Sequence, residues 1–335
     1  MKRWNLKADT TDLSGLVMEE VSQPQPAAGE VRIRVHAVSL NARDQMVITL
    51  PFYRMPGRDL IPVSDGAGEI DAVGEGVSDW KVGDRVTNLF FRNWTDGPPN
   101  ADIGLGLASL DEDGMLAEYV VLKADRVARM PESLSYAEAA ALPCAGLTAW
   151  SALGGAHPVR RGDQVLVLGT GGVALMALAL AKGRGAEVTV TSSKKDKIER
   201  AKVLGAVDGV NYAQTPDWGQ AVFAKTGGVD RVVNAVGSSE LNASVAALKY
   251  GGEVASMGVF TAGNDFQVQL LMMKTATLRG TMVGSASMHR ALVQDIDANQ
   301  VKPPIDRHYR FEDAHAAFEA QRSPKVFGKI VIDII

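Results

Sequence analysis

The residues with the clearest chemical signal form one glycine-rich turn. Its sequence is Gly169-Thr170-Gly171-Gly172-Val173-Ala174, and its first, third and sixth positions match the G-x-G-x-x-G/A pattern of dinucleotide-binding turns. A glycine at the first position permits a tight turn, and one at the third lets the backbone approach a pyrophosphate. The turn follows an apolar run at 164–168 and opens a helical pattern at 173–184, so a helix N-terminus would face the phosphates. We therefore predict a dinucleotide site here, with a glycine-rich turn in a non-binding α/β domain as the alternative.

The end of the next predicted strand, 188–191, indicates which dinucleotide is bound. The chain continues as Ser192-Ser193-Lys194-Lys195-Asp196-Lys197, so hydroxyls and lysines stand where an NAD site places an acid for the ribose 2′-OH. A 2′-phosphate would be repelled by a carboxylate and held by these groups. The pattern predicts NADPH as the cofactor, with NADH also possible, and a solvated basic turn is the alternative.

The elements that must position these residues change character along the chain. The first third has short period-two strands such as 31–35, separated by glycine turns, which favours a small barrel or sandwich. After about residue 143, strand-like and helical runs alternate, which predicts an α/β domain with a parallel sheet covered by helices on both faces. A chain of 335 residues is expected to form two domains. The polar stretch 93–113 is predicted to be a loop over the surface or over a cleft.

The composition excludes several classes of protein. Hydrophobic residues make up 46% of the chain and charged residues 22%, which is ordinary for a globular protein, and the net charge of −4 argues against a nucleic-acid partner. Cys144 is the single cysteine, so neither an intrachain disulfide nor a multi-cysteine zinc site can form. The charged start lacks a secretory apolar region, and no apolar run approaches the roughly 20 residues that span a bilayer. We expect a cytoplasmic protein with no membrane partner.

Several further motifs carry a family resemblance over nearly the whole chain. They are Ser39-Leu40-Asn41-Ala42-Arg43-Asp44, the segment 65–74, Gly83-Asp84-Arg85-Val86, the segment 143–150, the dinucleotide turn and the ending 327–331. Together they resemble the medium-chain dehydrogenase/reductase superfamily, and most closely its zinc-free branch of quinone oxidoreductase-like and alcohol dehydrogenase-like proteins. The resemblance implies a GroES-like β-rich catalytic domain from residues 1–145 and 285–335. It implies a Rossmann domain, with a doubly wound parallel sheet, at residues 146–284.

The resemblance also raises the question of zinc. It places Asn41, Ser64 and Cys144 at the positions of the catalytic Cys, His and Cys ligands, and the four-cysteine structural lobe is missing. One amide, one hydroxyl and one thiol do not make a tetrahedral zinc site, so we predict no metal. Zinc held by Cys144 and Asp65 is the alternative. We expect Cys144 to be a small buried hydrophobic residue near the cofactor.

The resemblance assigns further cofactor contacts residue by residue. Ser192 matches the ribose-reading position, and Lys197 and Tyr212 match positions that hold the 2′-phosphate. Lys329 matches a basic residue that meets the pyrophosphate. Matches beside the nicotinamide and along the cofactor are Asn41, Thr148, Ala235, Val236, Gly258, Val259, Phe260 and Val283.

The candidate catalytic groups follow from reduction without a metal. If hydride adds to an enone or a quinone, charge collects on oxygen, and a hydroxyl or amide donor near that oxygen is sufficient. Tyr53 is the candidate donor, with Asn41 and Ser64 as other lining groups, and a loop tyrosine packed on Phe52 is the alternative. Phe90, Phe91 and Trp94, with Phe260, are predicted to form an apolar substrate wall. Most of the methionines at 257, 272, 273 and 282 are expected in the core.

Three functions remain open at this point. The first is an NADPH-dependent reductase of quinones, enones or related small-molecule carbonyls. The second is an NADP-dependent alcohol dehydrogenase or aldehyde reductase of the same superfamily. The third is a non-catalytic NADPH-binding sensor. The resemblance further suggests a homodimer formed through the edge run 277–283.

Overall fold

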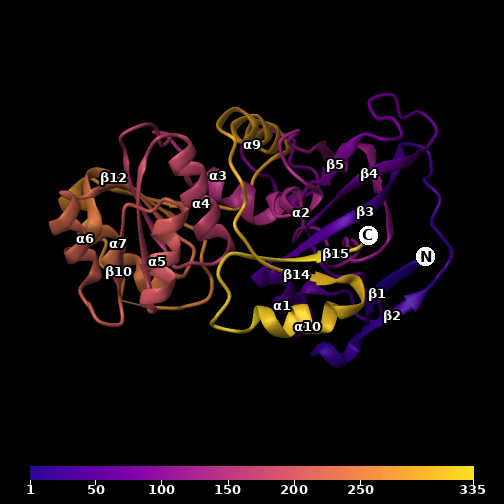
Figure 1. Cartoon of the computed structure of the whole chain (residues 1–335), viewed down its shortest axis with the longest axis horizontal. Helices are drawn as coiled ribbons and strands as arrows, with labels where there is room; N and C mark the ends of the chain where they lie inside the picture. The colour runs from indigo at the N-terminus through magenta and orange to yellow at the C-terminus, as the bar shows by residue number, and fades with distance from the viewer. Residues whose placement is uncertain (264) are drawn as a thin grey trace. The chain divides into compact units, whose positions relative to one another are not determined.

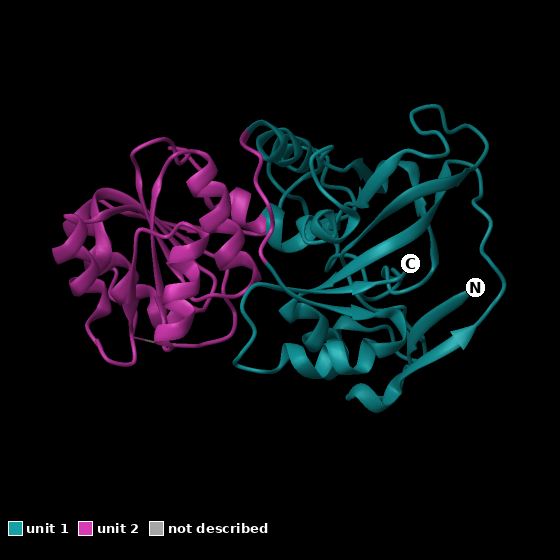
Figure 2. Cartoon of the chain, in the orientation of Figure 1, with its two compact units in different colours: residues 1–147, 284–298, 305–335 teal, residues 148–283, 299–304 magenta. Residues whose placement is uncertain are grey.

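The computed structural model describes residues 1–263 and 265–335, and these divide into two compact units (Figure 2). Unit 1 comprises Met1–Leu147, Gly284–Ala298 and Ile305–Ile335, and unit 2 comprises Thr148–Val283 and Asn299–Pro304. The first unit is therefore discontinuous in sequence, and two of its four boundaries with unit 2, at 147/148 and 283/284, are within two residues of the predicted 145/146 and 284/285. The segment Asn299–Pro304, which the sequence analysis placed in the first domain, belongs to unit 2.

Unit 2 is built on a six-stranded sheet in the order β10-β9-β8-β11-β12-β13, and every pairing is parallel. Numbered along the chain, this is the order 3-2-1-4-5-6 of a Rossmann fold, whose switch point lies between β8 and β11. The predicted doubly wound sheet is confirmed. The strands are β8 (Gln164–Leu168), β9 (Glu187–Ser192), β10 (Asp208–Asn211), β11 (Val229–Asn234), β12 (Leu248–Ser256) and β13 (Thr277–Gly280).

Helices connect these strands, and most of the strand residues are buried. The central strand β8 reads as a continuous apolar run because it is covered on both faces. Trp218 of α6 and Val245 of α7 pack in one core cluster with Leu166 of β8. The helices are α3 (Leu147–Ala152), α4 (Gly172–Gly183), α5 (Lys195–Leu204), α6 (Trp218–Thr226), α7 (Leu241–Ala247) and α8 (Gln269–Lys274) (Figure 1).

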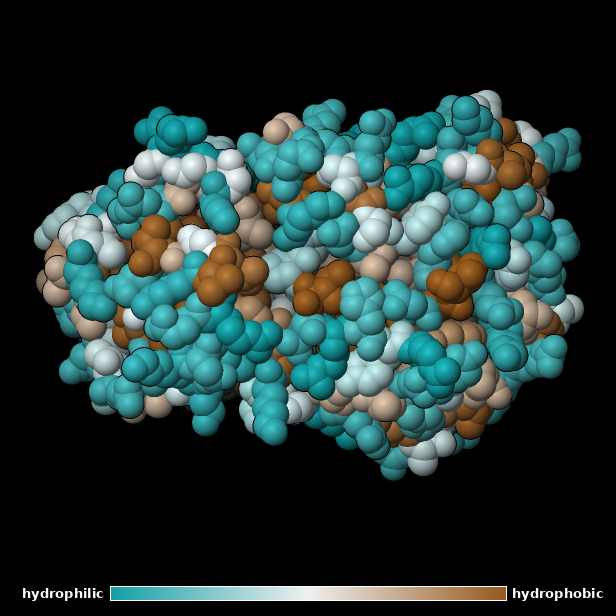
Figure 3. Space-filling model, in the orientation of Figure 1, coloured by the Kyte–Doolittle hydropathy of each residue, from teal (hydrophilic) through white to brown (hydrophobic). Residues whose placement is uncertain are grey.

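Three of the four methionines predicted to lie in the core are exposed at the surface of unit 2. Met272 and Met273 of α8 are 73% and 72% exposed, and Met282 is 49% exposed. The expectation that most of the four methionines fill the core was wrong, because Met272 and Met273 lie on the exposed side of the short helix α8 and Met282 follows the edge strand β13. On the face drawn in Figure 3, hydrophobic residues form separate patches among hydrophilic ones.

Unit 1 is built mainly from antiparallel strands around the long strand β3 (Glu30–Leu40). Val31, Ile33 and Val35 alternate with less buried residues along it, as the period-two pattern predicts. The seven-stranded sheet has the order β14-β15-β3-β4-β5-β7, with β6 also paired to β3, and β1 pairs with β2. The other strands are β1 (Lys2–Leu6), β2 (Leu16–Glu20), β4 (Gly66–Val73), β5 (Arg85–Asn88), β6 (Tyr119–Lys123), β7 (Val127–Arg129), β14 (Ile305–Arg310) and β15 (Lys329–Asp333).

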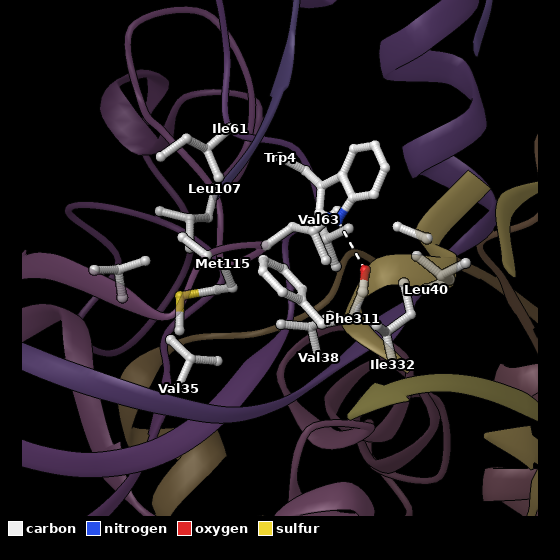
Figure 4. Packing of buried hydrophobic residues seen from close by; sticks show 14 of the residues in the cluster. Trp4, Val35, Val38, Leu40, Ile61, Val63, Leu107, Met115, Phe311 and Ile332 are labelled. Carbon is white, nitrogen blue, oxygen red and sulfur yellow. Dashed lines mark hydrogen bonds between the residues drawn. The ribbon is translucent and has the colours of Figure 1, made fainter. Parts of the chain in front are cut away.

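Both ends of the sequence contribute to the core of unit 1. The indole Nε1 of Trp4 donates a hydrogen bond of 2.8 Å to the carbonyl of Phe311, within a cluster that also contains Val38, Met115 and Ile332 (Figure 4). Strand β15 pairs antiparallel with β3, with Ile330 opposite Leu40. This pairing brings Lys329 to the end of β3, where the candidate site begins. The helices of the unit are α1 (Ala42–Thr49), α2 (Tyr136–Ala139), α9 (Ala286–Asn299) and α10 (Ala314–Gln321).

Two further observations concern the described residues of the whole chain. None of their helices combines the length and apolar character needed to cross a membrane. The stretch 93–113 contains only one short 3₁₀ turn, Ala101–Ile103, and several of its residues line a polar cavity of about 740 Å³ in unit 1. The prediction of a loop at 93–113 is confirmed.

Candidate functional site

The glycine-rich turn lies at the carboxyl end of β8 and opens α4. Gly169 has a φ of +86°, which favours glycine, and its N–H donates to the carbonyl of Thr191 at 3.1 Å. Gly171 is the N-cap of α4 in an extended conformation. A Cβ added at either glycine would have no atom within 4 Å. Gly171 is therefore not required by packing within the chain, and the open space in front of it fits a pyrophosphate at a helix N-terminus.

The carboxyl end of β9 brings together the residues predicted to select the cofactor. Ser192 is buried, and its Oγ accepts a hydrogen bond of 3.2 Å from the Lys194 N–H. Its carbonyl accepts one of 3.2 Å from the N–H of Tyr212, whose side chain is exposed. Lys197 is half-buried in the first turn of α5. The strand end thus presents hydroxyls and lysines, and the first acid along the chain is Asp196, which is exposed in α5.

A residue that the sequence analysis missed holds the next two loops of unit 2. Asn234, buried at the end of β11, accepts hydrogen bonds from the N–H groups of Val236 and Gly237 at 3.0 and 3.1 Å. The backbone carbonyl of Asn234, as distinct from the side-chain Oδ1 used in those two bonds, accepts the Gly258 N–H at 3.1 Å. A Cβ at Gly258 would lie 2.3 Å from the backbone of Val236. The loops after β11 and β12 are therefore fixed to each other. The available signal was an asparagine directly after the apolar pair Val232-Val233 at the end of a predicted strand.

The other predicted cofactor residues of unit 2 differ in exposure. Val259 and Phe260 are 68% and 59% exposed, whereas Thr148 and Val283 are nearly buried. Ala235 follows Asn234 directly and belongs to the fixed loop described above. Phe260 therefore presents an apolar ring at the surface of unit 2, next to the loop that Asn234 organises.

In unit 1, the end of β3 carries a buried cation. Lys329 is 2% exposed, and its Nζ donates to the carbonyl of Leu40 at 2.6 Å and to Oδ1 of Asn41 at 2.5 Å. Burial lowers the pKa of Lys329, and the nearby Asp65 carboxylate opposes that shift. The residue that the resemblance assigned to the pyrophosphate thus directs its ammonium to Asn41.

Hydrogen bonds continue from Asn41 through the neighbouring predicted residues. Asn41 Nδ2 donates to Ser64 Oγ at 3.3 Å, and Ser64 Oγ donates to Asp65 Oδ1 at 2.8 Å. The other carboxylate oxygen of Asp65 accepts the Cys144 N–H at 2.9 Å. Burial raises the pKa of Asp65, and Lys329 opposes this. Asn41, Ser64 and Cys144, which are far apart in sequence, are therefore brought into one network.

Asp44 supports this network from the first turn of α1. Its carboxylate accepts the Asn41 N–H at 2.6 Å and the Ser64 N–H at 3.3 Å, and burial raises its pKa to about 6. Asp44 therefore has the structural role expected for it, which is to hold the loop that carries Asn41.

The backbone before Ser64 is strained. Val63 is a buried β-branched residue with a φ of 72°, a conformation that costs on the order of 1–3 kcal/mol. Its carbonyl accepts the Met115 N–H at 2.8 Å, which helps to hold it in place. The backbone conformation of Val63 therefore sets the direction of the chain, and of the Ser64 side chain, immediately after it.

The residues at the three ligand positions do not fit a zinc ion. Asn41 Oδ1 accepts from the Lys329 ammonium, and Ser64 Oγ donates to Asp65. An amide oxygen already bound to a cation and a serine hydroxyl do not supply the Cys and His ligands of a tetrahedral zinc site. Over residues 1–263 and 265–335, no three His, Cys, Asp or Glu side chains gather as a metal site requires.

Aromatic residues of unit 1 gather around a guanidinium that the sequence analysis missed. Arg43 lies over the rings of Phe90 and Tyr53, at 5.0 and 5.7 Å from their centroids, and donates to the carbonyl of Leu107 at 2.8 Å. Phe90 packs edge-on against Phe91 at 4.7 Å. The sequence offered one signal for Arg43, which is its place in the segment Ser39–Asp44 that carries part of the family resemblance.

Three of the four residues of the predicted aromatic wall pack together in unit 1. Trp94 packs against Phe91 at 5.7 Å, and all three aromatic residues of the wall in unit 1 are buried. Phe260 belongs to unit 2. Tyr53 is half-buried and packs on Phe52 at 4.2 Å, the arrangement given above as the alternative to a donor role.

A discontinuous β-rich unit combined with a Rossmann unit that carries a dinucleotide turn defines a two-domain oxidoreductase. The described geometry agrees with two family models, "Alcohol dehydrogenase GroES-like domain" at residues 27–132 and "Zinc-binding dehydrogenase" at residues 172–298. The chain is 38% identical to a zinc-type alcohol dehydrogenase-like protein of Schizosaccharomyces pombe, over 99% of both sequences. It is 31% identical to an alcohol dehydrogenase of Moraxella sp., over 95% of the chain and 96% of that protein.

Solved structures give the same result. A putative alcohol dehydrogenase from Sinorhizobium meliloti 1021 superposes with a TM-score of 0.91 at 36% identity, over 100% of both chains. A structure described as an NAD-dependent alcohol dehydrogenase superposes with a TM-score of 0.87 at 30% identity, also over 100% of both chains. The chain belongs to the medium-chain dehydrogenase/reductase superfamily, as an alcohol dehydrogenase-like oxidoreductase.

Proposed function

We propose that this protein is a zinc-independent, NADPH-dependent reductase of small carbonyl compounds, with quinones and enones as its acceptors. The observation that carries the proposal is the state of Asn41. Its amide is held between Lys329 and Ser64, at the position where zinc-dependent relatives would have a metal ligand. This arrangement offers a hydrogen-bond donor to an acceptor oxygen and no set of metal ligands.

The residues of the site have the following roles in this proposal. When bound, the nicotinamide supplies a hydride to the conjugated carbon of the acceptor. The negative charge that collects on the acceptor oxygen is stabilised by a hydrogen-bond donor lining the site. The first candidate is the Asn41 amide, which in the free protein hydrogen-bonds to Ser64 and Asp65. A proton from solvent then completes the reduction. Tyr53 remains a second candidate donor, and the aromatic residues beside Arg43 provide an apolar wall.

The preference for NADPH is supported by the end of β9, and it gives a direct prediction. Ser192→Asp places a carboxylate where a 2′-phosphate would lie and where a 2′-OH would be accepted. We expect the ratio of kcat/KM for NADPH to that for NADH to fall at least about tenfold, a change of roughly 1.4 kcal/mol. Steady-state kinetics with both cofactors measure the ratio. Ser193→Asp adds the same charge one residue away and serves as the control, and an equal fall in both variants would contradict the assignment.

Alcohol dehydrogenase or aldehyde reductase activity is the second candidate, and the names of the relatives favour it. A panel of quinones, enones, aldehydes, ketones and alcohols, assayed with NADPH, NADP⁺ and NADH, separates the candidates. Reduction of quinones or enones that persists after chelation supports the proposal. Alcohol-dependent reduction of NADP⁺ by a sample containing zinc would replace it with the second candidate. Tight NADPH binding without turnover of any compound would instead indicate a sensor.

We also propose that the protein is a homodimer through β13. This strand ends the sheet order, so one edge of it has no partner within the described sheet. Exposed apolar side chains lie nearby in the sequence, at Met272, Met273 and Met282. Antiparallel pairing of β13 with its copy would extend the sheet across two molecules. Sedimentation at micromolar concentration is expected to give twice the chain mass of 35.6 kDa, and a monomer would contradict the proposal.

A further inference from the structure

The loops 235–239 and 257–263 follow β11 and β12, and they pair with each other beyond the sheet. The Phe260 N–H donates to the carbonyl of Val236 at 3.0 Å. A Cβ added at Gly237 would lie 2.2 Å from a carbonyl oxygen of the second loop, so the two backbones are in direct contact. The parallel pairing of β11 with β12 therefore continues into these two segments, which we call the paired loops.

The buried side chain of Asn234 fixes the start of both paired loops. Asn234 ends β11 and is fully buried. Its Nδ2 donates to the carbonyl of Gly237 at 2.9 Å, and its Oδ1 accepts the N–H groups of Val236 and Gly237. Its backbone carbonyl accepts the N–H groups of Met257 and Gly258 at 3.0 and 3.1 Å. An amide can donate and accept at once, whereas a carboxylate can only accept, so this arrangement requires asparagine rather than aspartate.

The paired loops lie on one side of the dinucleotide turn, and the predicted adenosine site lies on the other. In the sheet order, β8 stands between β9 and β11. The turn after β8 is assigned to the pyrophosphate, and Ser192 at the end of β9 to the ribose of the adenosine half. A dinucleotide that crosses the carboxyl edge of the sheet in this way has its nicotinamide half beside β11. Val259 and Phe260 of the paired loops are largely exposed and offer that half an apolar surface.

We propose that Asn234 is a positioning residue for the nicotinamide half of the cofactor. Its hydrogen bonds hold the paired loops in one arrangement in the free protein, so that binding of the cofactor does not have to order them. Because Asn234 is fully buried, it acts through the loops and does not itself touch the cofactor. The inference rests on the dinucleotide site of the proposed function, and it is independent of which acceptor is reduced.

The test compares the binding of NADPH with that of 2′,5′-ADP, which carries the adenosine and the 2′-phosphate but no nicotinamide half. Asn234→Asp keeps the shape and the accepting oxygen, but at neutral pH it places a second carboxylate oxygen against the Gly237 carbonyl. We expect the Kd of NADPH to rise about 5–50-fold, because a buried donor is lost and the loops are no longer held in the binding arrangement. The Kd of 2′,5′-ADP is expected to change by less than about twofold. Isothermal titration calorimetry on the full chain measures both constants.

Asn242→Asp is the matched control. Asn242 lies in α7, where its Nδ2 donates to the carbonyl of Asp265 at 3.0 Å and its Oδ1 accepts the Gln267 N–H at 3.0 Å. The substitution therefore removes the same kind of bond outside the paired loops, and both Kd values should stay within about twofold of the wild type. Ser192→Asp gives the opposite contrast, because it acts on the adenosine half and should weaken the binding of 2′,5′-ADP as well as that of NADPH.

Two results of the titrations would overturn the inference. One is an unchanged Kd of NADPH in N234D. The other is an equal loss of affinity for NADPH and 2′,5′-ADP, which indicates a general structural role. If N234D does not fold, Gly258→Ala replaces it, because its new Cβ would lie 2.3 Å from the backbone of Val236 and would force the paired loops apart while the Asn234 side chain stays intact. The same selective loss of NADPH affinity is expected.

A measurement without any ligand tests the paired loops directly. Amide hydrogen exchange of residues 235–239 and 257–263 in the free protein is expected to be faster in N234D than in the wild type, and unchanged in N242D. Unchanged exchange in N234D would contradict the role of Asn234 in holding the loops. If the wild type binds NADH in preference to NADPH, the proposed cofactor preference fails, and the same comparison with NADH and 5′-AMP decides the inference separately.

Discussion

Gly171→Asp is expected to weaken NADPH binding at least about 100-fold, equivalent to roughly 2.7 kcal/mol. The new carboxylate would lie where no atom of the chain stands within 4 Å of the added Cβ, which is the space assigned to the pyrophosphate. Its charge would repel the phosphates directly. The fold should not suffer, because residue 171 is the N-cap of α4 and aspartate is a favoured N-cap residue. Fluorescence titration with NADPH measures the loss of affinity.

Gly280→Asp is the matched control for this prediction. A Cβ at Gly280 also has no atom within 4 Å, and its φ is not positive, but it lies at the end of β13. It should leave NADPH affinity within about twofold of the wild type, because β13 is three strands away from β8 in the sheet order and the turn follows β8. Equal loss of affinity in the two variants, or none in Gly171→Asp, would remove the turn from the binding site.

Arg231→Met is expected to lower the free energy of unfolding by about 3–5 kcal/mol. Arg231 is 2% exposed, and its guanidinium donates to the carbonyls of Ala152, Gly154 and His157 after α3 and lies 3.3 Å from Glu253. Methionine would leave buried carbonyls without these donors. Arg279, at 2.7 Å from Glu253, would keep that carboxylate paired but cannot replace the other contacts. Urea denaturation followed by circular dichroism measures the change.

Lys225→Met provides the contrast within the same unit. The ion pair of Lys225 with Asp208 has a similar distance, 3.0 Å, but its side chains are 53% and 40% exposed. Exposed pairs of this kind contribute roughly 0–1 kcal/mol, so little change is expected. A loss in Arg231→Met as small as that in Lys225→Met would show that the Arg231 network does not stabilise unit 2.

Much of unit 2 could be predicted because its signals are local. An apolar run, a glycine turn and a helical pattern are adjacent in sequence at β8 and α4, and strand and helix patterns alternate through the rest of the unit. The helix that Gly171 caps therefore begins where the turn predicts. The exposure of Met272 and Met273 could not be predicted in this way, because methionine occurs both in cores and at surfaces. Which of the two applies depends on the face of α8 that another element covers.

The site in unit 1 was only partly accessible from sequence. Motif matching indicated Asn41, Ser64 and Cys144, but neither the strain at Val63 nor the ring contacts of Arg43. A valine in an apolar stretch is typical of a strand, and only the surrounding contacts hold it at a positive φ. In the sequence alone, Arg43 is typical of a charged surface residue. Only the fold places the rings of Phe90 and Tyr53 against its guanidinium.

By itself, the sequence determined the class of this protein. It specified a dinucleotide turn, a strand end without an acid, and two ligand positions that carry an amide and a hydroxyl, since each depends on residue type at one place in the chain. Only the tertiary structure decided what Asn41 does. Its partner Lys329 is 288 residues away, and the antiparallel pairing of β15 with β3 both joins them and removes the ammonium from water. Charge, burial and donor direction at the site are consequences of that long-range pairing.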